Sequence, residues 1–570
     1  MQNANNERDH QKVSEGKTRV AALQFASGTD VGENLVTCLR MIDEAAVHCP
    51  DVMVLPEFCN HISWYEDADH AWRVAVELEG SFLEAVAARA RQHDCYIVIN
   101  VSLRNTDGLI TVTSLMYSPC GARLARADKQ TLMGHENTWF TRADTVGDVV
   151  DAPFGKVGIF PCRDGVTFET PRCLALRGVQ LFCDSLNSFA LDEASLHVPA
   201  RAPENRCFLV AANKVGPLIP ANVLEAVSAE THIPVKFLYG AGESQIVSPA
   251  GEVLARGPRD EEAVVWADIE LEQALDKRRE DGTDIVASRR PEIYTEIAEA
   301  PEQAQATEPV ASAQVATLVP SSSGKAALAE LPDLISRISS ETRVAVLPEM
   351  FCLSWEEVDF AVDVIDALAA SLQERRDLLL CTSLPLPAAG GSALAAVLVG
   401  ADGLVFRQDQ LHANARLPGL SLADEFKFCE VEWGRVCICT ADDMRYPEIA
   451  KLAAIKGAHL LLVPGVPHPD WEAAWALPSR AAENRMCVVY SSEHGQIANL
   501  TADFTLMTSW RERSFDGYIN QPLITRVRAS VTEVQLNLGA AANKLMSEQT
   551  DLIADRPWHL SGGIVAELAE

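Results

Sequence analysis

A thiol at the end of an apolar run is the residue whose position first suggests chemistry. The stretch FGKVGIFPCRDGVTFE (154–169) contains a glycine turn, the apolar run VGIF, and then Cys162, Arg163 and Asp164. This order is typical of a buried strand that delivers a side chain to the edge of a sheet. A cysteine becomes a strong nucleophile only as the thiolate, so catalysis would need a proton acceptor from elsewhere in the chain. Taken alone, Cys162 is most often a core thiol.

The same stretch recurs 279 residues later without the thiol. The segment WGRVCICTADDMRYPE (433–448) repeats the glycine, the apolar run, the aspartate and the glutamate, and Ala441 stands at the position of Cys162. Because a methyl group cannot attack a carbonyl or a nitrile, thiol chemistry at this position belongs to the first copy alone.

Other segments repeat in the same order, which indicates one fold written twice. RVAALQF matches QVATLV, DVMVLPEF matches VAVLPEMF, and PARAPENRCFLVAANK matches PSRAAENRMCVVYSSE. Two copies indicate a duplication rather than a solenoid array. We therefore expect a disordered tail (1–18), a first domain (19–297), a linker rich in Ala, Glu, Gln and Pro (298–313) and a second domain (314–570).

The elements that must position the thiol alternate between strands and helices. Apolar strand-like runs such as DVMVLPEF and CYIVINVSL are separated by stretches with helical spacing of apolar residues. This alternation predicts an α/β domain with buried strands. Residues 110–129 read as a hairpin, so we expect a mixed sheet rather than a simple dinucleotide-binding order.

Composition and charge narrow the functional classes. The 570 residues carry 48 basic and 80 acidic side chains, a formal charge of −32. The electric field of this negative charge repels phosphate backbones and anionic lipid, so we expect no nucleic-acid or membrane partner.

The N-terminal residues and the cysteines favour a cytoplasmic protein with reduced thiols. The chain starts with polar residues and lacks an apolar signal core there, and its 15 cysteines are scattered. The pairs Cys59/Cys352 and Cys437/Cys439 lack metal-site spacing and predict buried thiols, not a metal centre.

With these motifs the chain resembles the nitrilase superfamily, the carbon–nitrogen hydrolases, as two tandem copies that cover almost its whole length. The resemblance rests on Glu57 in VLPEF, Lys129 in ARADKQTL and Cys162 in GIFPCRD. Glu136, in GHENTWF, fits a further glutamate that family members usually carry. The resemblance implies an α/β fold of two tandem four-layer αββα sandwich domains, with no metal or organic cofactor.

It also implies a role for each residue. Cys162 would attack the substrate and form a thioester, while Glu57 would take the thiol proton and later activate water. Lys129, with the backbone N–H of Arg163, would stabilise the oxyanion. Glu136 would orient Lys129 or bind the substrate.

Arg163 departs from the family pattern, which often has an aromatic residue after the nucleophile. Its guanidinium could favour the thiolate or bind a carboxylate group of the substrate. The alternative is a surface arginine paired with Asp164.

The second copy keeps only part of the catalytic set. Glu349 matches Glu57, but Gln408 stands at the lysine position, Ala415 at the Glu136 position and Ala441 at the nucleophile. We therefore expect a catalytically degenerate half. Its role would be structural, as one side of an intramolecular pseudo-dimer that could form further homo-oligomers.

The predicted function is hydrolysis of a non-peptide carbon–nitrogen bond in a small-molecule amide or N-carbamoyl compound. Two alternatives use the same site, namely nitrile hydrolysis and acyl transfer to an amine. A third alternative, from another class, is a non-catalytic binding or regulatory protein that retains the fold.

Overall fold

The structure is a computed structural model that describes residues 16–301, 308–467 and 469–567. Most of the predicted tail (1–15) and the middle of the predicted linker (302–307) lie outside the described residues. The first strand begins at Thr18 and the first strand of the second half at Ala313, each one residue before the predicted domain. Among the described residues, none of the helices has the length and apolar character needed to cross a bilayer.

Two mixed sheets make up the first half. Sheet I has the strand order β13-β1-β2-β4-β5-β6, with β3 beside β4, and sheet II has the order β12-β11-β10-β9-β8-β7. Parallel strands lie at the centre of each sheet and antiparallel pairs at its edges, as the hairpin predicted. The strands of sheet I are β1 Thr18–Gln24, β2 Val52–Val54, β3 Val76–Glu77, β4 Tyr96–Arg104, β5 Ile110–Tyr117, β6 Arg123–Asp128 and β13 Ala263–Ile269. Those of sheet II are β7 Val149–Ala152, β8 Gly155–Pro161, β9 Leu181–Ser185, β10 Phe208–Ala212, β11 Gln245–Val247 and β12 Val253–Arg256.

The second half repeats this topology except for β3, which has no counterpart in sheet III. Sheet III runs β18-β17-β16-β15-β14-β25 and sheet IV runs β19-β20-β21-β22-β23-β24, with the same succession of parallel and antiparallel pairs. Sheet III contains β14 Ala313–Leu318, β15 Thr342–Glu349, β16 Leu379–Ala388, β17 Gly391–Gly400, β18 Gly403–Asp409 and β25 Val531–Leu536. Sheet IV contains β19 Cys429–Val431, β20 Gly434–Ile438, β21 Leu460–Pro464, β22 Cys487–Ser491, β23 Gln496–Asn499 and β24 Leu523–Arg526, and a separate hairpin pairs β26 Leu545–Ser547 with β27 Thr550–Asp551.

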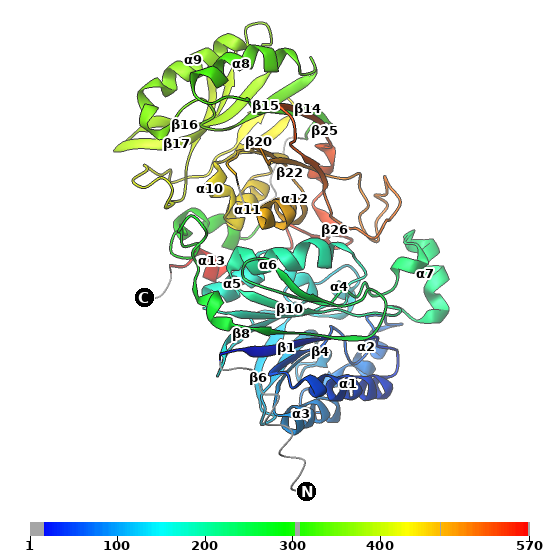
Figure 1. The fold of residues 1–570 in the computed structure, drawn as a ribbon. Coiled ribbons are helices and arrows are strands. Elements are labelled where there is room, and N and C mark those ends of the chain that lie inside the picture. The colour runs from blue at the N-terminus through cyan, green and yellow to red at the C-terminus, as the bar shows by residue number, and fades with distance from the viewer. Residues whose placement is uncertain (1–15, 302–307, 468, 568–570) are drawn as a thin grey trace.

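Helices cover the outer face of every sheet, so each half has four layers (Figure 1). The sheets of each half pack face to face around an apolar core. In the first half, α1 Val31–Ala45 and α3 Ser81–His93 cover sheet I, and α5 Glu169–Leu176 and α6 Val198–Asn205 cover sheet II. In the second half, α8 Lys325–Ser336 and α9 Ala361–Ser371 cover sheet III, and α11 Pro447–Ile455 and α12 Leu477–Asn484 cover sheet IV. The remaining α-helices are α2 Ala68–Val74, α4 Glu136–Trp139, α7 Leu224–Thr231, α10 Ala441–Met444 and α13 Gly562–Val565. The predicted αββα fold class is confirmed.

The two halves meet through the helices that cover sheets II and IV (Figure 1). One apolar cluster there contains buried residues of both halves, among them Phe168, Cys173, Tyr446 and Ile449. Buried ion pairs cross the same contact in reciprocal fashion: Arg172–Glu448 (2.8 Å) and Lys451–Glu169 (3.1 Å), then Arg201–Glu483 (3.0 Å) and Arg480–Glu204 (2.9 Å). Reciprocal pairs of this kind are the signature of an approximate two-fold axis.

Candidate active site

Strand β8 carries the nucleophile candidate to the site because both of its faces are buried. Val157 and Ile159 point into the core between the sheets, and Phe160 points toward the covering helices. Such alternation explains why the run VGIF is apolar throughout. The strand ends at Pro161, and Cys162 then opens a short 3-10 helix, Cys162–Gly165.

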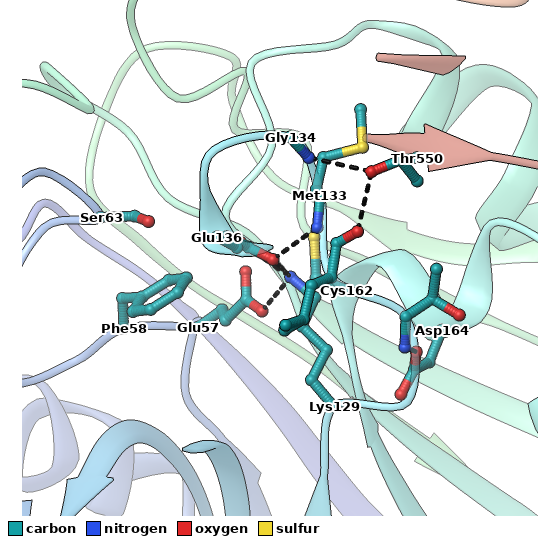
Figure 2. Close-up of polar contacts among 12 residues, drawn as sticks. Glu57, Phe58, Ser63, Lys129, Met133, Gly134, Glu136, Cys162, Asp164 and Thr550 are labelled. Carbon is teal, nitrogen blue, oxygen red and sulfur yellow. Dashed lines mark hydrogen bonds and ion pairs between the residues drawn. The ribbon is translucent and has the colours of Figure 1, made fainter. Parts of the chain in front are cut away.

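The structure brings all four predicted catalytic side chains together (Figure 2). Glu57 follows β2, Lys129 follows β6 directly, and Cys162 follows β8. Lys129 Nζ lies 2.8 Å from Glu57 Oε1 and 2.9 Å from Glu136 Oε1. Glu57 and Lys129 are each 1 % exposed and Cys162 is 9 % exposed, so the set is nearly closed off from solvent.

Burial sets the protonation of these groups. It raises the pKa of Glu57 to about 7, although the charge of Lys129 opposes the shift. Burial alone would lower the pKa of Lys129, but Glu136 and Glu57 together raise it well above its usual value. Burial also raises the pKa of the Cys162 thiol well above its usual value. The resting site therefore holds a neutral thiol, a charged lysine and a carboxyl group poised to exchange a proton near neutrality.

The backbone at Cys162 is held in an unusual conformation. Its φ is 43°, in the left-handed region that costs a non-glycine residue about 1–2 kcal/mol. The N–H of Cys162 donates to Asp184 Oδ1 at 3.0 Å, which secures this conformation. The N–H of Arg163 lies in the first turn of the 3-10 helix, where amide groups have no acceptor within the helix. It is therefore available to an oxyanion.

The side chain of Arg163 corrects one expectation from the sequence. It is 3 % exposed and therefore buried, not a surface arginine. Asp164 does not pair with it, because the Asp164 carboxylate accepts the N–H groups of Gln130 and Thr131, each at 2.9 Å. Within the described residues, Arg163 Nε and Nη1 have no hydrogen-bond partner. Asp164 instead holds the segment after Lys129 against the short helix Cys162–Gly165, which we call the nucleophile turn.

Three further buried groups around the thiol were missed from the sequence. Asp184 is the last residue but one of β9, Glu193 opens the π-helix Glu193–His197, and Lys214 donates to the carbonyl of Phe58 at 3.0 Å. Burial raises the pKa of Glu193 to about 8, and its charge contributes to the raised pKa of Cys162. These residues sit in runs such as LFCDSL and ALDEAS, which carry no sign of proximity to Cys162. Among the described residues, no cluster of three or more His, Cys, Asp or Glu side chains is arranged to hold a metal ion.

Comparison with known proteins places the first half in a family. A family model described as carbon–nitrogen hydrolase matches residues 19–279, the segment that carries the whole set. The first half of the chain belongs to the carbon–nitrogen hydrolase family. The family predicted for the first copy is thus confirmed.

Characterised relatives of this family match about half of the chain. A nitrilase of Pyrococcus abyssi is 29% identical over 256 residues, covering 45% of this chain and 90% of the relative. An omega-amidase of Xenopus tropicalis is 27% identical, covering 49% and 97% respectively. An N-carbamoylputrescine amidase of Arabidopsis thaliana is 24% identical, covering 49% and 96%. Among solved structures, a mutant of the Nesterenkonia AN1 amidase aligns with a TM-score of 0.39 and 20% identity, over 47% of this chain and 97% of that one.

In the second half, the position equivalent to the hydrolase lysine is Gln410, not Gln408. In each half, the two N–H groups that follow this position donate to the aspartate of the nucleophile turn. Lys129 and Asp164 hold these places in the first half, and Gln410 and Asp443 hold them in the second. Gln408 lies within strand β18, two residues too early. The constant offset of 279 residues gives Gln408, but it does not hold here: Arg126 and Asp128 correspond to Arg407 and Asp409, at an offset of 281.

The rest of the second site also lacks the catalytic arrangement. Ala441 begins helix α10, capped by the Thr440 side chain, and so has an ordinary helical backbone where Cys162 is left-handed. Glu349 is kept and buried, but Arg416 contacts it at 2.6 Å and also reaches Asp442 at 2.7 Å. Among the described residues of this half, no thiol, lysine or left-handed residue stands at the positions equivalent to Lys129 and Cys162.

Proposed function

We propose that the first half hydrolyses a non-peptide carbon–nitrogen bond of a small amide or N-carbamoyl compound through a thioester at Cys162. The observation that carries this proposal is Lys129, held between Glu57 and Glu136 beside the neutral thiol. A lysine fixed by two buried carboxylates has little role in stability alone, because burying three charges costs more than their attraction returns.

In the first step, the sulfur of Cys162 attacks the carbonyl carbon while Glu57 takes the thiol proton. The carbonyl electron pair moves to oxygen, where the Lys129 ammonium and the Arg163 N–H stabilise the charge. When the intermediate collapses, the C–N bond breaks and Glu57 returns the proton to the departing nitrogen. The products of this step are a thioester and ammonia or an amine.

In the second step, water replaces the departed amine. Glu57 takes a proton from the water as its oxygen attacks the thioester carbon. Collapse of this intermediate breaks the C–S bond, and the proton on Glu57 returns to the sulfur. A carboxylic acid leaves, or a carbamic acid when the substrate is an N-carbamoyl compound. A pKa near 7 suits a group that must accept and release a proton in both steps.

Arg163 supports a substrate that carries a carboxylate. Its buried Nε and Nη1 lack hydrogen-bond partners within the described residues, although the charges of Glu169, Asp164 and Glu193 act on the guanidinium. Buried donors without acceptors are costly, and a carboxylate of the substrate would supply the acceptors. The amides to test first are therefore those with a carboxylate at the far end of the acyl chain.

Cys162→Ala tests the proposal. The variant should lose ammonia release from a panel of amides with and without a carboxylate, by at least about a thousandfold, because no other nucleophile stands at the strand end. Circular dichroism and thermal unfolding serve as controls for folding. Unchanged turnover in Cys162→Ala would end the hydrolase assignment and favour the binding-protein alternative.

We also propose that the two halves form an intramolecular pseudo-dimer, with the second half as a non-catalytic scaffold. The reciprocal ion pairs between helices α5, α6, α11 and α12 support it. The matching strand orders of the two halves support it as well.

A further inference from the structure

The second half reaches the candidate active site through the short hairpin β26–β27. Thr550, at the start of β27, is fully buried against the loop that follows Lys129 (Figure 2). Its Oγ1 accepts the N–H of Gly134 at 3.0 Å and donates to the carbonyl of Leu132 at 2.9 Å. One hydroxyl from the second half thus spans a three-residue turn of the first.

This turn holds the carboxylate of Glu136 in place. Met133, at its centre, donates its N–H to Glu136 Oε2 at 2.8 Å, and Glu136 Oε1 accepts from Lys129 Nζ at 2.9 Å. Gly134 has a φ of 50°, a left-handed conformation that a glycine adopts without strain. A continuous line of hydrogen bonds therefore runs from Thr550 through the turn to Glu136, Lys129 and Glu57 (Figure 2).

We propose that Thr550 is a positioning residue for the hydrolase reaction, through which the second half holds Glu136 against Lys129. The inference rests on the proposed function and extends it, because it gives the degenerate half a specific task at the first site. Asn137 and Met133 make weaker contacts with the same hairpin, at 3.4 Å to the carbonyl of Gln549 and 3.5 Å to Ser547. Asn137 also donates to the carbonyls of Leu132 and Gly134 from within the first half. Among the described residues of the hairpin, Thr550 is the one whose side chain bonds to the backbone on both sides of the turn.

The hydroxyl of Thr550 forms hydrogen bonds with polar backbone groups that are buried in the turn. Without the hydroxyl, the N–H of Gly134 would lose its acceptor, and the carbonyl of Leu132 would keep only the longer bond from Asn137 Nδ2 at 3.3 Å. The turn would then relax to regain hydrogen bonds. A shift of the turn moves Glu136 and loosens Lys129. Small displacements of this kind reduce rates strongly, because oxyanion stabilisation depends on geometry.

Thr550→Val in the full chain tests the inference, since valine keeps the shape and removes the hydroxyl. We expect kcat to fall by about tenfold or more, with a smaller change in KM. Thr550→Ser, which restores the hydroxyl, should recover most of the activity. Thr382→Val is the matched control: Thr382 is equally buried and donates to the carbonyl of Pro348 at 2.9 Å within the second half. It should leave kcat unchanged.

A pH profile separates positioning from general destabilisation. The negative charge of Glu136 helps to raise the pKa of Glu57, whereas the charge of Lys129 lowers it. With Lys129 still bonded to Glu57 Oε1, displacement of Glu136 should therefore move the acid limb of kcat/KM to lower pH in Thr550→Val. A merely structural role would leave this limb in place. If Thr550→Val does not fold, Thr550→Cys, which keeps the size but hydrogen-bonds weakly, takes its place.

Two outcomes would overturn the inference: an unchanged kcat in Thr550→Val, or an equal loss in Thr382→Val with no shift of the acid limb. Cys162→Ala, assayed in parallel, distinguishes this failure from failure of the proposed function. An inactive Cys162→Ala beside a fully active Thr550→Val would refute the positioning role alone.

Discussion

At the scale of single residues, the site is defined by burial more than by residue type. Glutamate, lysine and cysteine occur throughout the chain, but Glu57, Lys129 and Cys162 are buried together. The charge of each of them affects the pKa of at least one of the others. Because Glu57 has its pKa raised to about 7, it can be a proton acceptor for the thiol and a donor to the leaving nitrogen at similar pH.

The raised pKa of Glu57 predicts the pH dependence of the reaction. The base must be ionised before it can take the thiol proton, so activity falls as pH drops through the pKa of Glu57. We expect kcat/KM, measured from about pH 5 to 9, to show an acid limb near pH 7. An acid limb near 4.5, the ordinary value for glutamate, would show that burial does not tune this group.

At the scale of elements, the sequence motifs predicted the strand ends well because each motif contains the end of a strand. VLPEF and GIFPCRD both place a chemical group directly after an apolar run, and the structure puts Glu57 and Cys162 there. Gln408 was misplaced because the offset of 279 residues does not hold at this strand end, where Asp128 and Asp409 differ by 281.

Contacts between distant segments could not be predicted. Asp184 secures the Cys162 backbone from the neighbouring parallel strand, and Thr550 reaches Leu132 from 418 residues away. Such contacts depend on how sheets and halves pack, and hydrophobic periodicity reports only the face that an element buries. The burial of Arg163 escaped the sequence for the same reason.

The helices between the halves allow a stability prediction. Glu448 is fully buried and pairs with Arg172 at 2.8 Å and Arg289 at 3.5 Å. Glu448→Ala leaves two buried guanidinium groups without this carboxylate, which should cost about 3–5 kcal/mol and lower the thermal midpoint by several degrees. Glu262→Ala, which removes an exposed pair with Arg40, is the control and should change the midpoint little. Equal effects would mean that the interface ion pairs add nothing to stability.

At the scale of the whole molecule, the two halves share one fold but differ in the residues at the site. Equivalent left-handed residues persist in both, such as Arg206 and Arg485, whereas the strained backbone of Cys162 becomes helical at Ala441. The left-handed backbone is present at Cys162 and absent at the equivalent Ala441. This difference is expected if the strained conformation serves catalysis, while the features shared by both halves serve the fold.

The pseudo-dimer predicts that a cut between the halves leaves them together. A protease site placed between residues 301 and 308 of the full chain, once cleaved, should give two fragments that co-elute and keep activity, because the buried interface and not the linker holds them. Fragments that separate, with full activity in the first, would contradict both the pseudo-dimer and the task assigned to the second half.

The most direct test of the central claim is the mass of a trapped acyl intermediate. The enzyme, incubated with a slowly hydrolysed amide and quenched in acid, is digested and its peptides are weighed. We predict a gain equal to the acyl group of the substrate on the peptide that contains Cys162, and no gain on the peptide that contains Ala441. Turnover without an adduct on Cys162, or an adduct on another residue, would contradict the account.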